Sequence, residues 1–427
     1  MSLDTKLNSL YTIKNGIKTA LNNKKYNSNQ FNDYPNIINN IKYKLNDVKF
    51  VNCPSTDLDF TDVEIINTND LYNYFAGSPN LVNVINMVDT SNVTRASRMF
   101  YSCPSLETVS NFNTSNVTDM QSMFERCNNL VTIPNFDTSN VTNMLNMFYQ
   151  CYNLTSVPDL DTSNVTDMKG MFYSCNKLTS VPNLNTSKVT DMSNMFSGCY
   201  NLTTVPNFDT SNVTNMCRIF QGNAKLTSVP NLNTSKVTDM GYAFGYCSGL
   251  TSIPNFDTSN VTNMNHAFVG CGSLTSIPDL DTSNVTDMKG IFAQYNLVTV
   301  PNFNTINVTD MSVAFSGAKK LTAVPNWDTS NVLNLAEAFY GAFKLVDVPQ
   351  LNTSNVTNMS YTFRQCNNLS DASIQNIINM CLNSNITNST LKNISNANGY
   401  SPFSFSNITS TRYSNRLSEL AAAGWSY

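Results

Sequence analysis

The stretch VTDMSNMFSGCYNLTTVPNFDTSN, residues 189–212, recurs along the chain with a period of 24 residues. A phenylalanine, Phe196 in this copy, marks each unit. The 13 marker phenylalanines, over about residues 70–370, are Phe75, Phe100, Phe124, Phe148, Phe172, Phe196, Phe220, Phe244, Phe268, Phe292, Phe315, Phe339 and Phe363. A fixed period of this length is typical of solenoid proteins, in which each unit packs only on its neighbours.

Each unit combines two local patterns. The first half places apolar residues at i, i+3, i+4 and i+7, which is typical of one face of a short helix. In the quoted copy these residues are Met192, Met195, Phe196 and Cys199. The stretch from Leu202 to Val205 is rich in β-branched residues and predicts a short strand that ends at Pro206. We therefore expect an α/β repeat solenoid, a leucine-rich-repeat-like stack of about 13 short strand-plus-short-helix units.

The composition excludes several classes of function. The chain has 427 residues, of which 13% are charged, with a formal net charge of −4 and a single histidine. A nucleic-acid-binding protein would carry a basic stripe, so we expect no nucleic-acid partner. The low charge follows from the repeat itself, because columns of stacked like charges repel each other. Asparagine, threonine and serine take the place of charged residues in these columns.

The two ends of the chain do not repeat, so we expect three parts, residues 1–50, 51–370 and 371–427. The N-terminal part has leucines and isoleucines spaced by three or four residues, which predicts a helical segment for attachment or oligomerisation. In the C-terminal part, Asp371 is expected to cap a helix that closes the solenoid, with the tail around Trp425 folded back as a cap. We find no signal peptide and no apolar run long enough to span a membrane.

Eight of the eleven cysteines occupy one repeat position, three residues after the phenylalanine. They are Cys103, Cys127, Cys151, Cys175, Cys199, Cys247, Cys271 and Cys366. Other units have a different residue there, such as Asn223 or Ala318, which a disulfide or metal framework would not tolerate. Without a C-x-x-C element or histidine partners, a zinc site is not expected. We expect free thiols that act as small buried residues in a reducing compartment.

Two columns of acids and amides follow from the repeat. The first runs Asp137, Asp161, Asn185, Asp209, Asn233, Asp257, Asp281, Asn304, Asp328 and Asn352; the second runs Asn143, Asp167, Asp191, Asn215, Asp239, Asn263 and Asp287. Stacked carboxylates about 5 Å apart would repel each other, and mixed asparagines limit that repulsion. Lys188 and Lys236 occur in units whose first-column residue is asparagine. We interpret the columns as structural ladders; calcium bound between carboxylates is the alternative, and no other cofactor is expected.

The sequence contains none of the common catalytic motifs, such as G-x-S-x-G, a Walker loop or H-E-x-x-H. Paired carboxylates such as Asp161 and Asp167 could in principle hydrolyse glycosides, but they recur in unit after unit, whereas an active site is normally singular. His266 lies at a variable position and is expected to be an exposed side chain. We expect a protein that is not an enzyme.

The residues on either side of the phenylalanine vary from unit to unit, so they form either plain solvent surface or a ligand face. Tyrosine is frequent among them, and tyrosine offers flat contact area at low entropic cost. The candidate ligand-face residues are Tyr101, Tyr149, Tyr152, Tyr173, Tyr200, Tyr242 and Tyr340. A glycan or a protein would suit such a face.

The repeat resembles that of the BspA-like leucine-rich-repeat surface proteins. The likeness lies in units such as Val165–Cys175 followed by Leu178–Pro182, and it covers about 70% of the chain. That family implies a bacterial surface protein in adhesion, although its members usually carry export signals. The beginning of the chain, with Phe31–Pro35, resembles tail, fibre and appendage proteins of gut bacteriophages, and Leu420–Trp425 resembles the end of phage-borne versions of this repeat.

Together these resemblances imply a virion structural protein of a crAss-like or related gut phage, assembled in the host cytoplasm. The N-terminal segment would bind other virion proteins and form a homo-oligomer, and the solenoid would bind a host-surface protein or glycan without entering a membrane. Two alternatives remain open: a purely structural virion component without a ligand, and a bacterial cell-surface adhesin.

Overall fold

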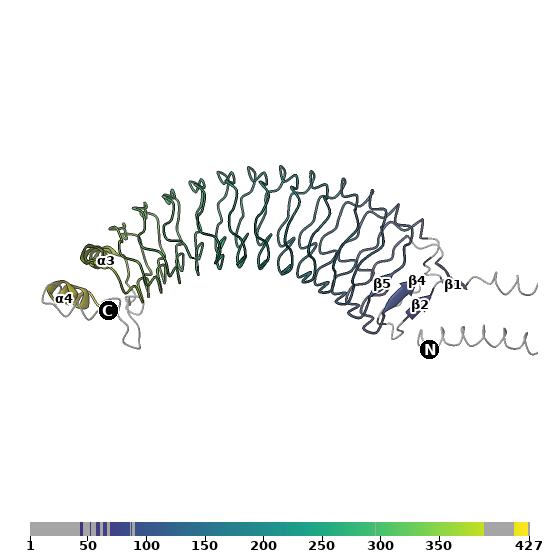
Figure 1. The fold of residues 1–427 in the computed structure, drawn as a ribbon, viewed down its shortest axis with the longest axis horizontal. Coiled ribbons are helices and arrows are strands. Elements are labelled where there is room, and N and C mark those ends of the chain that lie inside the picture. The colour runs from purple at the N-terminus through teal and green to yellow at the C-terminus, as the bar shows by residue number, and fades with distance from the viewer. Residues whose placement is uncertain are drawn as a thin grey trace, which may run out of the picture. The chain divides into compact units, whose positions relative to one another are not determined.

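The computed structural model describes residues 69–387, apart from 86, 88, 89 and 295, together with 414–425 and the short stretches 43–45, 52, 57–59 and 63–65. Two compact units divide the chain, residues 1–161 and residues 162–427, and each is described by itself. In each of them the repeats form a succession of coils that follow one another along the chain (Figure 1). The expected N-terminal helical segment, apart from residues 43–45, lies outside the described residues.

The expected short helix is absent from the coils that the structure describes in residues 162–363, and a series of turns takes its place. Helical residues have φ near −60°, but Asn194 has a φ of +59° and Gly198 a φ of +76°. The amide of Met195 donates to the carbonyl oxygen of Met192 at 3.1 Å, a bond between residues three apart. The expectation of a helix was therefore wrong, although its apolar face is correct.

We call the part of each coil around the marker phenylalanine, where these turns lie, the turn half. Its other amides show why no helix forms, because they bond to the next coil. The amide of Asn194 donates to the carbonyl of Cys217 at 2.9 Å, and that of Phe196 donates to Ile219 at 3.0 Å. Alternate amides thus bond within their own coil and to the next coil. The turns still direct residues at i, i+3, i+4 and i+7 inward, because Met192, Met195, Phe196 and Cys199 are fully buried. Apolar spacing alone does not distinguish such a turn ladder from a helix.

The expected strand is also reduced. In residues 1–161 three strands form one parallel sheet in the order β2–β4–β5, with β2 at Asp57–Asp59, β4 at Asn83–Ile85 and β5 at Thr108–Val109. A second parallel pair joins β1 (Tyr43–Leu45) to β3 (Val63–Ile65).

Among the described coils of residues 162–363, this position keeps only isolated contacts, such as the bond from the amide of Thr203 to Thr179 at 3.2 Å. Pro206, which follows, has no amide hydrogen to donate. Because the hydrogen bonds between neighbouring coils stop at the proline, too few follow one another at this position to form a strand.

A more regular connection between coils lies at the second acid and amide column. Parallel bridges link Asp167 to Asp191 and continue from coil to coil as far as Asn334 and Asn358. Around Asn215, for example, the amide of Thr214 donates to Thr190 and the amide of Met216 donates to Asp239, both at 2.9 Å. The side chains of this column are therefore held at fixed intervals by the backbone.

The core is a stack of identical side chains, as the repeat predicted. The rings of Phe196 and Phe220 are nearly parallel, with centroids 5.9 Å apart, and both rings are fully buried. Within residues 1–161, Phe100 and Phe124 stack in the same way at 5.3 Å. Such ring pairs add to the free energy gained by burying the rings themselves. Leucine and valine columns, exemplified by Leu202 and Val213, complete the core.

Helix α3, Asp371–Asn383, follows the last coil. Its N-cap is Ser370, whose hydroxyl accepts a hydrogen bond from the amide of Ser373, so the expectation that Asp371 caps this helix was wrong. Asp371 lies in the first helical turn, where a carboxylate interacts favourably with the helix dipole. The hydroxyl of Thr353 in the last coil donates to the carbonyl of Met380 at 2.6 Å. Helix α3 thus packs on the end of the coil stack.

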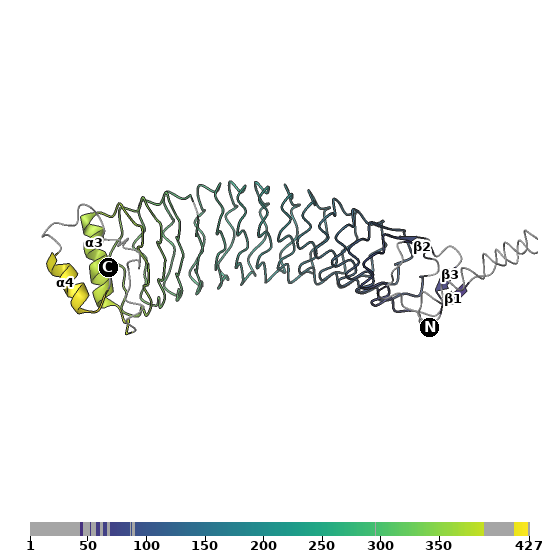
Figure 2. The same cartoon turned by 90° about the horizontal axis from the view of Figure 1, so that it is seen from below.

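Helix α4, Ser414–Ala422, lies beside α3 (Figures 1 and 2). Arg416 donates to the side-chain oxygen of Asn379 in α3 and also pairs with Glu419. Leu420 and Trp425 are buried, as expected for a tail that folds back. No helix within the described ranges is long and apolar enough to cross a membrane.

Candidate functional site

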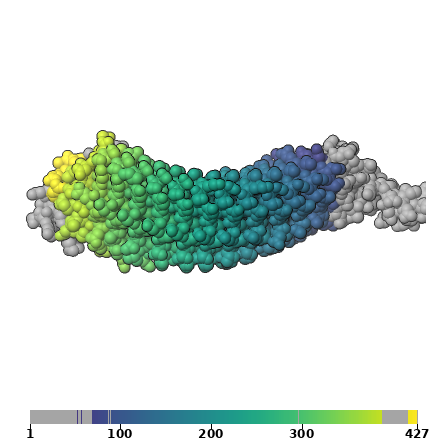
Figure 3. All heavy atoms as spheres, turned by 90° about the horizontal axis from the view of Figure 1, so that it is seen from above, coloured from purple at the N-terminus to yellow at the C-terminus, as the bar shows by residue number. Residues whose placement is uncertain are grey.

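The residues two before and two after each marker phenylalanine have an unusual backbone. Tyr242 and Tyr246, which flank Phe244 in this way, have φ values of +55° and +61°. A side chain at positive φ is strained, and the second position is often glycine, as at Gly198 and Gly222. The turn ladder therefore imposes a strained backbone on two of the positions that vary most between units. We call the surface formed by the positions two before and two after each marker phenylalanine the turn face. In the space-filling view the atoms of neighbouring coils within each compact unit are in contact (Figure 3).

The predicted tyrosines lie on the coils at three places. Tyr101, Tyr149, Tyr173 and Tyr340 directly follow the phenylalanine, Tyr152 and Tyr200 follow the cysteine, and Tyr242 lies two residues before the phenylalanine. Tyr200 is 53% exposed, and the other six are partly buried. Three of the seven belong to residues 1–161 and four to residues 162–427, where six repeats separate Tyr200 from Tyr340. They do not converge on one pocket, and their role as a ligand face stays a prediction.

The structure adds residues that the sequence pattern did not single out. Tyr246 is 47% exposed and lies against Gly270, where a Cβ atom would come within 2.7 Å of its ring. Arginines stack on several of the predicted tyrosines. Arg218 lies over Tyr242 at 5.2 Å from the ring centroid, and Arg364 lies over Tyr340 at the same distance. Arg364 itself lies at one of the variable positions noted in the sequence, but each arginine belongs to the unit before or after that of its tyrosine, so the pairing could not be found within one unit.

His266 is half-buried, and the expectation that it is exposed was wrong. Its ring stacks on Tyr242 with centroids 4.5 Å apart and an interplanar angle of 6°. On its other side the ring lies against Gly290, where a Cβ would clash with it. Burial lowers the pKa of the imidazole, and the positive charge of Lys289 lowers the pKa further. The side chain is therefore a neutral packing element at pH 7.

The first acid and amide column forms turns within each coil. The carboxylate of Asp257 accepts bonds from the hydroxyl and the amide of Ser259, at 2.7 and 3.1 Å, and these bonds lower its pKa. Asn185 makes the same two contacts with Ser187. Because an amide oxygen replaces a carboxylate oxygen without loss of a bond, the column acts as a turn element in both forms.

The second column forms a ladder between coils. The amide of Asn215 donates to the carboxylate of Asp191 at 3.3 Å, and that of Asn263 donates to Asp239 at 3.0 Å. Burial raises the pKa of Asp167, whose neighbour in the column is Asp191. Across the described residues, no group of three or more histidine, cysteine, aspartate or glutamate side chains is arranged to hold a metal ion.

A further column lies three residues after the first acid and amide column; it is usually asparagine, and Lys188 and Lys236 occupy it in two units, where they contact asparagines rather than the acids of the first column. The ammonium group of Lys188 donates to the side-chain oxygen of Asn164 at 2.7 Å, and Lys236 donates to Asn212 at 2.8 Å. The asparagines that usually occupy this column donate instead to a serine carbonyl of the preceding coil, as Asn260 does to Ser235. Lysine thus replaces one contact between coils with another.

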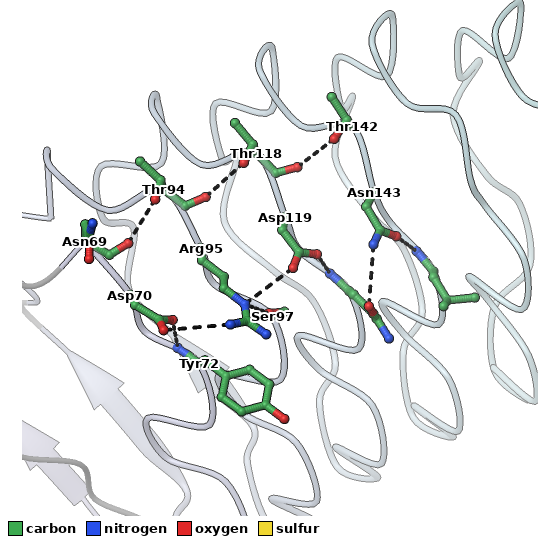
Figure 4. A network of polar contacts seen from close by, with 12 residues as sticks. Asn69, Asp70, Tyr72, Thr94, Arg95, Ser97, Thr118, Asp119, Thr142 and Asn143 are labelled. Carbon is green, nitrogen blue, oxygen red and sulfur yellow. Dashed lines mark hydrogen bonds and ion pairs between the residues drawn. The ribbon is translucent and has the colours of Figure 1, made fainter.

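Near the start of the coils the second column contains an arginine. Arg95 lies between Asp70 and Asp119, with nitrogen–oxygen distances of 3.8 and 3.6 Å, and its Nε donates to the hydroxyl of Ser97 at 2.8 Å (Figure 4). Its guanidinium carbon lies 4.2 Å from the centroid of the Tyr72 ring. A cation in this place balances two carboxylates that would otherwise face each other.

A threonine ladder runs beside this column. The hydroxyl of Thr118 donates to the carbonyl of Thr94, and that of Thr142 donates to Thr118, both at 3.2 Å (Figure 4). These bonds confirm that the repeated hydroxyls are structural. They leave the threonine side chains exposed at fixed intervals along the coils.

The cysteine column is buried and free of disulfides in the described coils. Each thiol also has a structural partner that the sequence did not suggest. Cys199 donates to the carbonyl of Phe172 at 3.0 Å, and Cys247 donates to Phe220 at 2.9 Å. Where Asn223 replaces cysteine, its amide donates to Phe196 at 3.0 Å in the same way. Burial raises the pKa of these thiols, to about 12 for Cys199, so they are not reactive thiolates at neutral pH.

Comparison with models of protein families places the repeats of this chain in a known family. The model of the family described as "Mycoplasma protein of unknown function, DUF285" matches eight overlapping segments, residues 47–155, 69–181, 129–204, 153–251, 175–276, 199–302, 250–321 and 293–399. The chain belongs to this family. A search of curated proteins found no match.

Three solved structures are similar at the level of the repeat. A leucine-rich cell surface protein from Faecalibacterium prausnitzii is 21% identical, with 76% of this chain and 90% of that chain covered and a TM-score of 0.35. A leucine-rich-repeat protein from T. pallidum is 22% identical, over 45% and 77% of the two chains, with a TM-score of 0.27. One from Bacteroides ovatus is 16% identical, over 73% of each chain, with a TM-score of 0.30.

Proposed function

We propose that this chain is a structural protein of a phage virion, a tail, fibre or capsid appendage, that displays its solenoid for binding to a host surface or glycan. The observation that carries the proposal is the contrast on the turn half of each coil. Its inward residues form columns of the same side chain, whereas the residues beside them change from unit to unit. Varied side chains on a fixed scaffold suit recognition by many weak contacts, which become effective through copy number.

In this proposal residues 1–50 attach the chain to other virion proteins and form a homo-oligomer. The protein assembles in the host cytoplasm and needs no catalytic group, cofactor or nucleic acid for its role. The resemblance of the two chain ends to phage proteins supports this location.

The most direct test of the location is mass spectrometry of purified particles, in which the chain should be present at a fixed stoichiometry. A chain with residues 1–50 deleted should be missing from the particles, while its solenoid remains folded. If the truncated chain still enters particles, the attachment role is wrong.

Two other functions fit the same coils. A purely structural component would enter particles but would not bind host cells at micromolar concentration. A bacterial adhesin, which the BspA-like repeat favours, would be found by immunolabelling on the surface of the cells that produce it and not in particles. Binding of the purified chain to host cells, together with its location, separates the three.

A further inference from the structure

Three arginines lie on neighbouring coils at the start of the repeats, and they differ in their counter-charges. Arg95 has two carboxylates, Asp70 and Asp119, within 4 Å. Arg98 and Arg126 have none: among the described residues, no carboxylate lies within ion-pair distance of either guanidinium group. The charge of Arg95 is balanced, whereas the charges of the other two arginines are not.

Arg98 and Arg126 both lie over the ring of Tyr101. The guanidinium carbon of Arg98 is 4.1 Å from the ring centroid, and that of Arg126 is 5.9 Å from it. Arg126 also donates to the Tyr101 hydroxyl at 3.3 Å and to the side-chain oxygen of Gln150 at 3.2 Å, both neutral acceptors. The Nε of Arg98 is buried without any acceptor in the described part of the chain.

This arrangement places two permanent positive charges beside one ring. The two guanidinium groups cannot be farther apart than the sum of their distances to the shared ring, and arginine stays charged at all physiological pH values. Elsewhere in the coils, asparagine separates like charges, as in the Asp191 and Asn215 pair. An anion that contacts both arginines would supply the counter-charge that neither has among the described residues, and guanidinium groups bind carboxylate and sulfate groups through paired hydrogen bonds.

We infer that Arg98, Tyr101 and Arg126 form a binding site for an acidic glycan, one that carries carboxylate or sulfate groups. The inference rests on the proposed function, because it names the ligand class of the turn face. Arg126 is exposed, and Arg98 and Tyr101 are half-exposed. The side-chain amide of Gln150 lies at the site, because its oxygen accepts a bond from Arg126 at 3.2 Å, and such an amide group can bind the hydroxyls of a sugar. Glu125 is an acid at a neighbouring position, and it pairs with neither arginine.

The test is binding of the full chain to immobilised glycans by biolayer interferometry. Chondroitin sulfate presents both acidic groups, hyaluronan presents carboxylates alone, and desulfated, carboxyl-reduced chondroitin presents neither. We expect the first or second glycan to bind and the neutral one not to bind, with affinity that decreases as salt increases. The R98A and R126A variants should each lose roughly tenfold in affinity, and the double variant should not bind.

The matched control is Lys320→Ala, which removes one exposed cation in a distant repeat that is not part of the turn face. It changes the net charge by the same amount and should bind as the wild type does. R98K and R126K keep the charge but lose the planar fork of donors, so each should lie between the wild type and its alanine variant. Thermal melts of each variant should give the Tm of the wild type, which shows that the variants are folded.

The inference is overturned if the wild type binds no acidic glycan, if Lys320→Ala weakens binding as much as R98A does, or if poly-glutamate binds as tightly as the glycans. Attachment to host cells is measured in parallel. If the chain attaches to cells but binds no acidic glycan, the site assignment fails and the proposed host binding stands. If it binds the glycans through the two arginines but does not attach to cells, the site stands and the proposed host binding fails.

Discussion

The inward and outward residues of one turn half obey opposite rules. Phe196 and Cys199 face the core and are completely buried, and most other units have the same residue at these two positions. Asn194 alternates with them, has a positive φ, is only partly buried, and is replaced by many residue types in other units. The difference teaches that backbone bonds and buried columns hold the coils together, so the outward side chains are free to change.

The strongest way to break this contrast is a change in a buried column. We expect Phe196→Ala to lower the free energy of unfolding by about 3–5 kcal/mol, because it removes a ring stacked on both sides and leaves a cavity. Tyr200→Ala, four residues away on the exposed side, should cost less than about 0.5 kcal/mol. Denaturant unfolding of both variants measures the difference. Similar losses for the two would show that inward and outward positions contribute equally.

In the cysteine column a substitution is expected to raise the stability of the chain rather than lower it. Asn223 fills a thiol position, and its amide nitrogen has a partner, but its side-chain oxygen is buried without one. An unsatisfied buried polar atom costs about 1–3 kcal/mol. We therefore expect Asn223→Cys, which restores the thiol donor, to stabilise the chain by about 1 kcal/mol or more. Asn223→Ala is the control: equal stability of the two variants would mean that the thiol bond to Phe196 contributes nothing.

Two glycines sharpen the contrast in the backbone. Gly222 has a φ of +81°, so Gly222→Ala should cost about 1 kcal/mol through backbone strain. Gly272 lacks a positive φ, and the nearest atom to a Cβ there lies 3.8 Å away. Gly272→Ala should therefore be neutral or stabilising by up to about 1 kcal/mol. A loss of Tm in the Gly272 variant equal to that in the Gly222 variant would contradict the argument.

The smallest expected effect is the pH dependence of the Tm, which arises from the first acid and amide column. Hydrogen bonds from Ser259 lower the pKa of Asp257, and the same contacts from Ser211 lower the pKa of Asp209. Their stabilising contribution is present above the unfolded pKa of about 4 and is lost as pH falls through the lower, folded pKa. Tm should therefore decrease below about pH 4. The double variant Asp209→Asn, Asp257→Asn should flatten this decrease, since Asn185 makes the same contacts.

Much of the architecture could be predicted from the sequence, because stacking forces each column to repeat. The period, the buried phenylalanine, leucine and cysteine columns, and the structural hydroxyl ladders are all confirmed. The short helix was wrong because a turn with residues at positive φ, such as Asn194, directs the same positions inward as a helix does. The N-cap at Ser370 was missed in favour of Asp371, its neighbour, since both residue types cap helices.

The candidate site was harder to predict. The tyrosines could be named from the variable positions, but the stacking of Arg126 on Tyr101 joins residues 25 apart in sequence. The packing of His266 between Tyr242 and Gly290 likewise depends on the two neighbouring coils. Contacts between coils become visible only when the register of the stack is known, and the register depends on backbone bonds that leave no mark in the residue types.

The direction of the backbone bonds has a consequence for the polarity of the stack. In the turn half the donors point to the next coil, as from Phe196 to Ile219, whereas at the threonine ladder they point to the preceding coil, as from Thr214 to Thr190. The peptide dipoles of the two rows oppose each other, unlike those of an α-helix, which add along its axis. A duplicated unit therefore adds less net polarity to the stack than it would if all its amides pointed toward the same neighbour.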